Sequence, residues 1–200
     1  PAFYAYQQSG ILMRSCDGFT VRDNVVKGVD WAIVFATDTD YGNGTCNNNT
    51  ISNNTMSGNY VVGSLLQGNC QDNTIANNTI SEGSRDGNGG IMLNGIPDDS
   101  PYPKLEGECN NNIVKNNNCT ATALGIFLFA AAYNNTIGPN NTTNENFYYG
   151  IILFNGASDN NIFNNTALNN GDCDIAVIDG VEPCLNNTFS NNTYVCFQEL

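Results

Sequence analysis

The sequence predicts an all-β fold, a parallel β-helix of about seven rungs with loop insertions, on three observations. One tract, NNNTISNNTM at residues 47–56, returns as QDNTIANNTI at 71–80 and in three later copies. A second short apolar run precedes each copy, such as GIML beginning at residue 90. The basic period of about 24 residues is too short for a strand and a full helix, so each strand must stack on its counterpart in the next copy.

An asparagine lies three residues after the apolar residue of every tract. Asparagine tolerates the left-handed backbone of a corner, and amides stacked between rungs can hydrogen-bond to one another. We therefore interpret this column as a structural ladder rather than a ligand site. The apolar register positions are Val21, Ile51, Ile75, Ile113, Ile137, Ile162 and Phe189, and the asparagines are Asn24, Asn54, Asn78, Asn116, Asn140, Asn165 and Asn192.

Composition excludes several classes of function. The chain has 200 residues and a net charge of -13, with 6 basic residues scattered along it, so it offers no positive surface for nucleic acid or anionic lipid. No apolar run approaches the ~20 residues that cross a bilayer. We expect no nucleic-acid partner, no membrane insertion, and one β-helix domain over residues 1–200, either complete or part of a longer assembly.

The 8 cysteines follow the repeat and, without histidine or a CxxC pair, favour disulfides in an oxidising compartment. Equivalent atoms on neighbouring rungs lie about 4.8 Å apart, which is within the Cα separation that a disulfide accepts. We expect bridges between Cys16 and Cys46 and between Cys70 and Cys109, and a secreted or cell-surface location. Partners for the other four stay open, an intermolecular bond included: Cys119, Cys173, Cys184 and Cys196.

The pattern GI-x-L followed by NN-x-I-x-x-N resembles the repeats of the NosD-like and carbohydrate-binding and sugar-hydrolase family of secreted and surface-layer proteins. The resemblance extends over nearly the whole chain, from Gly10 to Tyr194. It implies a right-handed parallel β-helix. Because polysaccharide enzymes, accessory proteins and surface structures all use this repeat, it does not select one function.

Alternation along the first strand of each copy predicts an apolar outer face. Insertions such as residues 94–108 can fold back over this face and cover it. The other explanation is an interface with another copy or a partner, because monomers seldom expose so much contiguous apolar surface. The expected interface residues are Leu12, Val34, Leu65, Met92, Phe127, Phe129, Ile152 and Phe154.

The outer side of the second strand is mostly polar, with Ser52, Val114 and Ser190 among its outward positions. It carries most of the N-x-S/T sequons. NNT is also what the corner requires, so sequons can arise as a by-product, but the low charged content of 12% favours covalent N-glycans on at least one of them. The sequon asparagines are Asn43, Asn48, Asn53, Asn77, Asn118, Asn134, Asn140, Asn141, Asn164, Asn186 and Asn191.

The sequence predicts no enzyme. No paired carboxylates recur on adjacent rungs, as acid/base glycoside hydrolysis requires, and without histidine most triads and metal-hydrolase sites are absent. Asp38, Asp40 and Asn43 in DTDYGNGT resemble the oxygen ligands of a calcium loop that lacks its closing glutamate, and a solvated acidic turn is the simpler interpretation. No other cofactor is expected, since copper needs soft or imidazole ligands and the methionines do not cluster.

We therefore expect an extracellular structural protein, a self-associating subunit of a cell-surface fibre, sheath or surface layer. The alternative is a carbohydrate-binding module, or a non-catalytic part of a polysaccharide-processing β-helix enzyme. Aromatic residues that can stack on sugars support this alternative: Trp31, Tyr41, Tyr148 and Tyr149.

Overall fold

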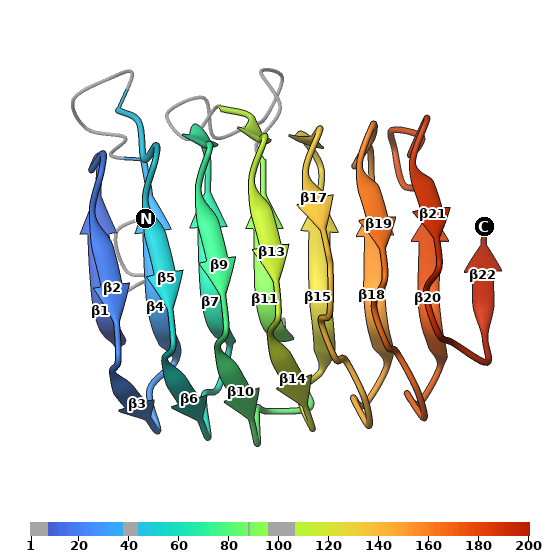
Figure 1. The fold of residues 1–200 in the computed structure, drawn as a ribbon, viewed down its shortest axis with the longest axis horizontal. Helices are drawn as coiled ribbons and strands as arrows, with labels where there is room; N and C mark the ends of the chain where they lie inside the picture. The colour runs from blue at the N-terminus through green and yellow to red at the C-terminus, as the bar shows by residue number, and fades with distance from the viewer. Residues whose placement is uncertain (1–7, 38–43, 88, 96–106) are drawn as a thin grey trace.

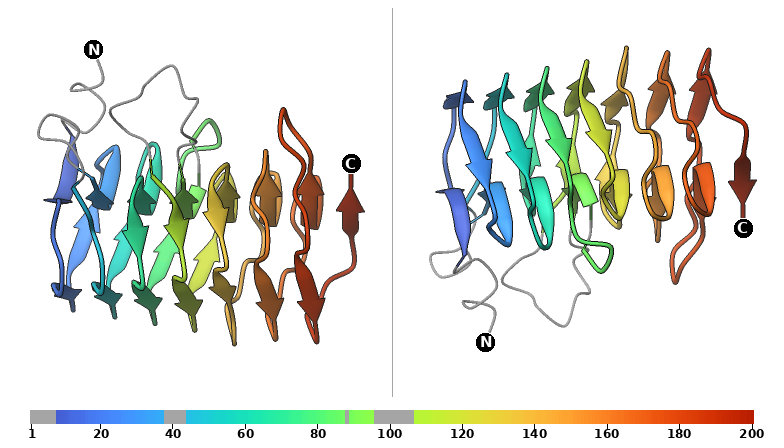
Figure 2. Two further views of the ribbon diagram at one scale, coloured as in Figure 1. Left: turned by 90° about the horizontal axis from the view of Figure 1, so that it is seen from above. Right: turned by 90° about the horizontal axis from the view of Figure 1, so that it is seen from below.

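The chain winds into a parallel β-helix. The computed structural model describes residues 8–37, 44–87, 89–95 and 107–200. All the regular secondary structure elements among these residues are β-strands. The rungs follow one another along the long axis, from blue at the N-terminal end to red at the C-terminal end (Figure 1). Views from above and below show the same even stacking, with the last strand at one end of the rod (Figure 2).

Two long sheets carry most of the strands within the described residues, and every pairing in them is parallel. The first, an eight-stranded sheet, consists of β1 (Ser9–Arg14), β4 (Trp31–Ala36), β7 (Val62–Gln67), β11 (Gly89–Asn94), β15 (Leu124–Phe129), β18 (Tyr149–Phe154), β20 (Cys173–Ile178) and β22 (Phe197–Glu199). The second, a seven-stranded sheet, consists of β2 (Thr20–Arg22), β5 (Thr50–Ser52), β9 (Thr74–Ala76), β13 (Ile113–Lys115), β17 (Thr136–Ile137), β19 (Asn161–Phe163) and β21 (Thr188–Ser190).

Two shorter sheets complete the described rungs at the corners. One contains β3 (Val25–Lys27), β6 (Thr55–Ser57), β10 (Thr79–Ser81) and β14 (Asn118–Thr120). The other contains β8 (Cys70–Gln71), β12 (Cys109–Asn110) and β16 (Ala132–Tyr133). Each rung therefore bends several times, and single columns of inward side chains fill the interior.

The register shifts by one residue at the fourth rung. Val114, not Ile113, pairs with Ile75 and with Ile137. Val114 is fully buried, whereas Ile113 is 38% exposed, so the expected register position at Ile113 and the outward placement of Val114 are both wrong. Ile113 and Val114 are two adjacent β-branched residues, and spacing counted across the preceding insertion cannot choose between them.

Two asparagine ladders run through the rod, at the corners on either side of the seven-stranded sheet. In each ladder the Nδ2 group donates to the Oδ1 atom of the asparagine on the next rung, at 2.9–3.1 Å. The first ladder is Asn24, Asn54, Asn78, Asn117, Asn141, Asn165 and Asn192. The second ladder is Asn49, Asn73, Asn112, Asn135, Asn160 and Asn187.

Asn116 and Asn140 were expected in the first ladder, and both assignments are wrong. Each is an exposed residue with a positive φ, 55° and 63°, immediately before the ladder asparagine. At the fourth rung the register position is Val114 rather than Ile113, so the ladder position falls on Asn117 instead of Asn116. At the fifth rung Gly138 and Pro139 lengthen the corner, so the ladder position falls on Asn141 instead of Asn140. The recurrent NN pair thus has two roles, because its first member turns the backbone and its second fills the ladder.

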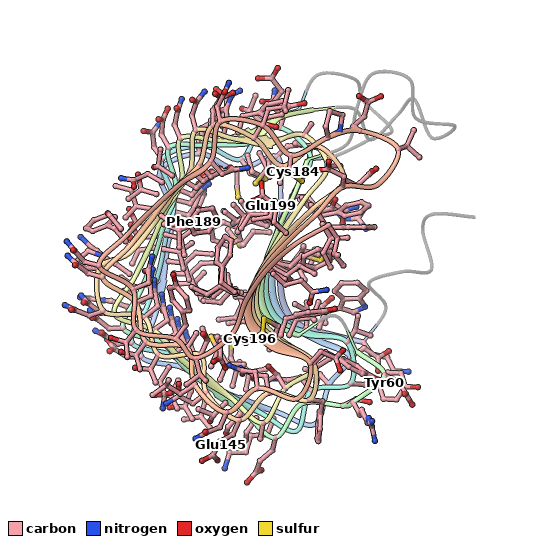
Figure 3. The ribbon with its side chains drawn as sticks, turned by 90° about the vertical axis from the view of Figure 1, so that its right-hand side faces the viewer. Tyr60, Glu145, Cys184, Phe189, Cys196 and Glu199 are labelled. Carbon is pink, nitrogen blue, oxygen red and sulfur yellow. A yellow bond between two sulfur atoms is a disulfide. The ribbon has the colours of Figure 1, made fainter. Side chains whose placement is uncertain are left out.

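A column of small residues explains the glycine of the GI-x-L pattern. A Cβ atom added to Gly63 would lie 2.7 Å from the Gly90 carbonyl oxygen, and one added to Gly90 would lie 2.6 Å from the Gly125 carbonyl oxygen. Here the eight-stranded sheet bends and the backbones of neighbouring rungs approach closely. The bend leaves the outer face of this sheet on the concave side of the cross-section (Figure 3).

We expect Gly90→Ala to lower the free energy of unfolding by about 3 kcal/mol, because backbone atoms of the next rung cannot move aside for the new methyl group. Gly28→Ala is the matched control, since Gly28 has open space around it and its φ is +64°. The control should cost about 1 kcal/mol, the strain of a left-handed alanine. Urea unfolding measures both, and equal losses would contradict the clash at Gly90.

Candidate functional site

The outer face of the eight-stranded sheet is apolar, as expected, but most of it is buried. Pairing places Leu12, Val34, Leu65, Met92, Phe127 and Ile152 in one outward column. Val34, Leu65, Met92 and Ile152 are buried, so these four expected interface residues are not accessible to a partner on this face. The physical reason is a second hydrophobic cluster outside the main core, in which Val34, Leu65 and Met92 pack with Trp31 and Phe127.

The accessible part of this face is a row of phenylalanines on the fifth and sixth rungs. The Phe129 ring stacks on Phe154 with centroids 5.7 Å apart, and Phe127 lies 5.6 Å from Phe129. All three are half-buried, as is Leu12 at the N-terminal end. The structure therefore leaves accessible an aromatic patch of Phe127, Phe129 and Phe154, three of the eight expected interface residues.

Other aromatic residues gather next to the start of β18. The guanidinium of Arg85 lies 5.7 Å from the Tyr148 ring centroid and 6.0 Å from that of Phe147. Burial, with the negative charge of Asp172 as a smaller cause, raises the pKa of Tyr149. Trp31 belongs to the second hydrophobic cluster, and Tyr41 lies outside the described residues.

A hollow of about 250 Å³ opens beside β16, lined by Tyr133, Asn155, Ser158 and Glu182 among others. Its polar groups hold the surrounding backbone. The Asn155 Oδ1 atom accepts from the Val181 and Glu182 amides, and the Ser158 hydroxyl donates to the Gly156 carbonyl. These bonds give the Asn155 and Ser158 side chains a structural role in holding the loop.

The cysteines stack as predicted but pair differently. Cys70 and Cys109 are partners in adjacent strands, and the Cys16 and Cys46 sulfurs are 3.7 Å apart. The structure nevertheless contains none of the expected bridges, and it joins Cys173 to Cys196 instead. The six cysteines that remain as thiols are Cys16, Cys46, Cys70, Cys109, Cys119 and Cys184.

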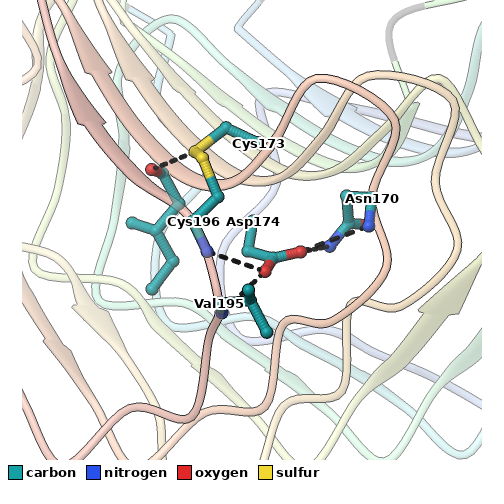
Figure 4. The surroundings of a disulfide bond; sticks show 6 residues. Asn170, Cys173, Asp174, Val195 and Cys196 are labelled. Atoms are coloured by element: carbon teal, nitrogen blue, oxygen red, sulfur yellow. Dashed lines mark hydrogen bonds between the residues drawn. A yellow bond between two sulfur atoms is a disulfide. The ribbon is translucent and has the colours of Figure 1, made fainter.

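The Cys173–Cys196 disulfide attaches the last strand to the seventh rung (Figure 4). Beside it the buried Asp174 carboxylate accepts hydrogen bonds from the Val195 and Cys196 amides on one oxygen and from Asn170 on the other. Sequence reasoning missed this arrangement. The available signal was the separation of 23 residues between the two cysteines, which is close to one repeat.

Asp174 makes the C-terminal end sensitive to acid. Burial would raise the pKa of its carboxyl group, but the hydrogen bonds from Val195, Asn170 and Cys196 outweigh burial and leave the pKa below its usual value. A lowered pKa stabilises the fold above the unfolded value of about 3.9, and this stabilisation is lost as the pH falls through the folded value. We expect Asp174→Asn to weaken the protein at pH 7 by about 2 kcal/mol and to flatten the acid limb of the stability curve. Urea midpoints at several pH values test this, and an unchanged acid limb would contradict it.

The sequons divide according to exposure. Asn141 is fully buried in the first ladder, so its expected glycosylation is wrong for the folded chain. Asn43 lies outside the described residues. The others are exposed: Asn48, Asn53, Asn77, Asn118, Asn134, Asn140, Asn164, Asn186 and Asn191.

The structure offers no metal centre within its described residues. No three histidine, cysteine, aspartate or glutamate side chains among them converge on one point. Met13 and Met56 face the main core from different strands, and Met92 lies in the outer cluster, so soft donors are dispersed. The calcium candidates Asp38, Asp40 and Asn43 fall outside the described residues. A search of the described part of the chain for a helix able to span a membrane finds none.

A solved structure with the same fold is the A-module of the mannuronan C-5 epimerase AlgE6 from Azotobacter vinelandii. It is 12% identical to this chain, with a TM-score of 0.59, over 92% of this chain and 57% of that one. This chain thus spans little more than half the length of that structure, and the likeness shows the fold, a right-handed parallel β-helix. A search of curated protein sequences finds no match.

A family model described as "Periplasmic copper-binding protein (NosD)" matches residues 4–172. The match covers more than four-fifths of the chain and includes the thiol column, most of both ladders and the aromatic patch. The periplasmic description of the family confirms the expected location outside the cytoplasm. The chain belongs to the NosD family of right-handed β-helix proteins.

Proposed function

We propose that this chain is an extracellular structural protein, a rod-shaped subunit of a cell-surface fibre, sheath or surface layer. The observation that carries the proposal is the pair of asparagine ladders. They repeat the same hydrogen bonds from rung to rung along the whole rod, so that nearly every rung is fixed in the same way as its neighbours. Uniform reinforcement of this kind suits a protein whose function is its shape and stiffness.

The surfaces of the rod support assembly in one direction and glycan attachment in another. The aromatic patch of Phe127, Phe129 and Phe154 lies on the eight-stranded sheet. The exposed sequon asparagines lie at other positions, many of them beside the ladders, as Asn53, Asn77 and Asn164 do. We propose that glycans occupy the ladder corners while the patch contacts another copy of the chain.

Copper takes no part in this proposal, because the described donors do not fit it. The chain has no histidine, and the methionines are dispersed. The stacked thiols lie one to a rung in a line, an arrangement that cannot surround one ion with three or more sulfurs. No step is therefore assigned to a metal.

The second candidate is binding of a carbohydrate polymer along the same outer face. The aromatic patch favours it, since aromatic rings form apolar platforms with defined stacking geometry. The A-module of similar fold is named as part of an epimerase of mannuronan, a polysaccharide. The two candidates differ in the occupant of the patch, which is a second copy in one and a glycan in the other.

Electron microscopy of the native secreted material, before and after a reducing agent, tests the main proposal. We expect regular fibres or sheets from the native protein and single rods from a Phe127→Asp/Phe154→Asp variant. Val25→Asp is the matched control, because Val25 is 67% exposed and lies on β3, in a different sheet from the patch and at the N-terminal end of the rod. Discrete rods from the unaltered protein, together with retention on a polysaccharide column that the double variant loses, would favour carbohydrate binding instead.

A further inference from the structure

The buried thiol column is a chemical feature that a rigid rod does not by itself require. Cys16, Cys46, Cys70 and Cys109 occupy the same interior position on four successive rungs. Three of them are completely buried, and Cys16, on the first rung, is 8% exposed. On the fifth rung alanine takes the position, with Ala132 paired to Cys109. The four thiols on successive rungs therefore lie in the N-terminal half of the rod, and Cys184, half-buried against the core, is a single thiol near the other end.

The geometry of the column is close to that of disulfides between rungs. The Cys16 and Cys46 sulfurs, 3.7 Å apart, are already in contact, so a small side-chain rotation can bring them to bonding distance. Cys70 and Cys109 are Cα partners in adjacent parallel strands, which stand about 4.8 Å apart. That spacing falls inside the range of about 4.4–6.8 Å between Cα atoms that a disulfide accepts.

The same half of the rod lacks a reinforcement that the other half has. At a third corner, Thr122, Asn146, Asn170 and Asp174 form a further polar ladder on the fourth to seventh rungs. On the first three rungs that corner holds Val29, Asn59 and Gly83, and the Asn59 side chain has no hydrogen-bond partner there. Three of the four rungs of the thiol column thus lack the third ladder, and the fourth rung carries both Cys109 and Thr122.

We propose that this column is a site of oxidative modification, in which an external dithiol–disulfide oxidoreductase forms two rung-to-rung disulfides, Cys16–Cys46 and Cys70–Cys109. This pairing uses all four thiols. A Cys46–Cys70 bridge would leave Cys16 and Cys109 separated by two rungs and unable to pair. Cys119 stays a thiol, because its partner in the adjacent strand is Ile80.

The reaction balances between the chain and the oxidant. The Cys46 thiolate attacks the disulfide of the oxidoreductase, which releases one of its sulfurs as a thiolate and forms a mixed disulfide. The Cys16 thiolate then attacks the Cys46 sulfur, forms the Cys16–Cys46 bond and releases the second sulfur of the oxidoreductase. Two thiols of this chain lose two electrons and two protons, and the oxidant disulfide gains them.

Burial determines when this step can occur. Hydrogen bonds from the Cys16 and Cys70 thiols lower the pKa of Cys46 to about 4, and burial raises the pKa of Cys109. These shifts apply only to the folded rod, in which Cys46 is inaccessible to an external oxidant. Oxidation must accompany winding of the N-terminal rungs, or their transient opening.

Disulfide mapping of the oxidised full chain tests the proposal. The reduced protein is unfolded and refolded in a glutathione redox buffer until Cys173–Cys196 has formed completely, which proves that the sample has met an effective oxidant. Free thiols are then alkylated, and the chain is digested without reduction for mass spectrometry. We expect linked peptides for Cys16–Cys46 and Cys70–Cys109, and, before alkylation, an intact mass lower than that of the reduced chain by six hydrogens. Alkylation of these four cysteines, or a Cys46–Cys70 link, would overturn the proposal.

Two variants separate pairing from folding. Cys119→Ser should keep both bridges, since Cys119 is outside the column. Cys16→Ser should lose its own bridge and make Cys46 alkylatable or able to pair with Cys70. The pairing does not depend on assembly into fibres, so single rods in the microscope with both bridges present would reject the proposed function and leave this inference standing.

Discussion

Replacing Asn78 by leucine is expected to cost about 4 kcal/mol of the free energy of unfolding, whereas the same replacement at Asn59 should be neutral or stabilising. Asn78 lies inside the first ladder. Its Nδ2 group donates to the Ile51 carbonyl oxygen at 3.0 Å and to the Asn117 Oδ1 atom at 3.0 Å. Its own Oδ1 atom accepts from the backbone and side-chain nitrogens of Asn54.

Leucine at position 78 would leave several buried groups without partners. The Asn54 backbone amide would lose its acceptor, the Asn54 Nδ2 group would keep only the Val21 carbonyl oxygen, and the Ile51 carbonyl oxygen would lose a donor. Each unsatisfied buried group costs about 1–3 kcal/mol, while the larger apolar side chain recovers part of the loss. The expected net effect is large because the ladder is shared between rungs.

Asn59 is the matched comparison, because it has the same residue type and nearly the same burial. It is 4% exposed, and neither its Nδ2 nor its Oδ1 atom has a hydrogen-bond partner in the structure. Burial of this amide costs desolvation free energy, and no hydrogen bond offsets it. An apolar replacement therefore removes a penalty and breaks no bond.

Urea unfolding of the two variants beside the unaltered protein measures the difference, provided that the slope of the transition is unchanged. Equal losses at Asn78 and Asn59 would mean that the amide bonds of the ladder contribute no more than side-chain volume. That result would remove the main support for a rod stiffened by its ladders.

Most of the fold could be predicted because its columns are periodic. The spacing placed Ile51, Ile75 and Ile162 correctly, and the first ladder is right at Asn54, Asn78 and Asn165. It failed where two adjacent residues are both plausible, at Ile113 and Val114 and again at Asn140 and Asn141. Periodicity locates a column to within one residue, but only packing decides which of two adjacent candidates turns inward.

The candidate sites could be predicted less well, for the same physical reason. The thiol column was found because it follows the period. Burial of Val34 and Leu65 on the outer face was not found, because alternation shows only which side of a strand a residue faces and not what packs over it. The third ladder was also missed, since it occupies only half of the rungs and mixes Thr122 with asparagines and Asp174.

The second large effect is expected at the C-terminal end, where removal of the Cys173–Cys196 bond should cost about 3 kcal/mol. The bond closes a loop of 23 residues, and the entropy of that loop in the unfolded chain accounts for a loss of this size. In the Cys173→Ser/Cys196→Ser variant β22 keeps its pairing with β20, and Asp174 still accepts from the Val195 and Cys196 backbone amides. The last strand should therefore remain in place in the folded state, but it should open more often.

Hydrogen exchange distinguishes this outcome from general loosening of the rod. Amides of β22 should exchange much faster in the variant. Those of β5 and β9, several rungs away, should change their exchange rates only as far as the free energy of global unfolding changes. Adding Asp174→Asn to the double variant should lower the free energy of unfolding more than it does in the disulfide-bonded chain. Without the disulfide, the Asp174 carboxylate is the side chain that still holds the backbone before the last strand. If the two changes were strictly additive, the disulfide and the carboxylate would hold the end of the rod independently, and the coupling inferred from their contact at Cys196 would be wrong.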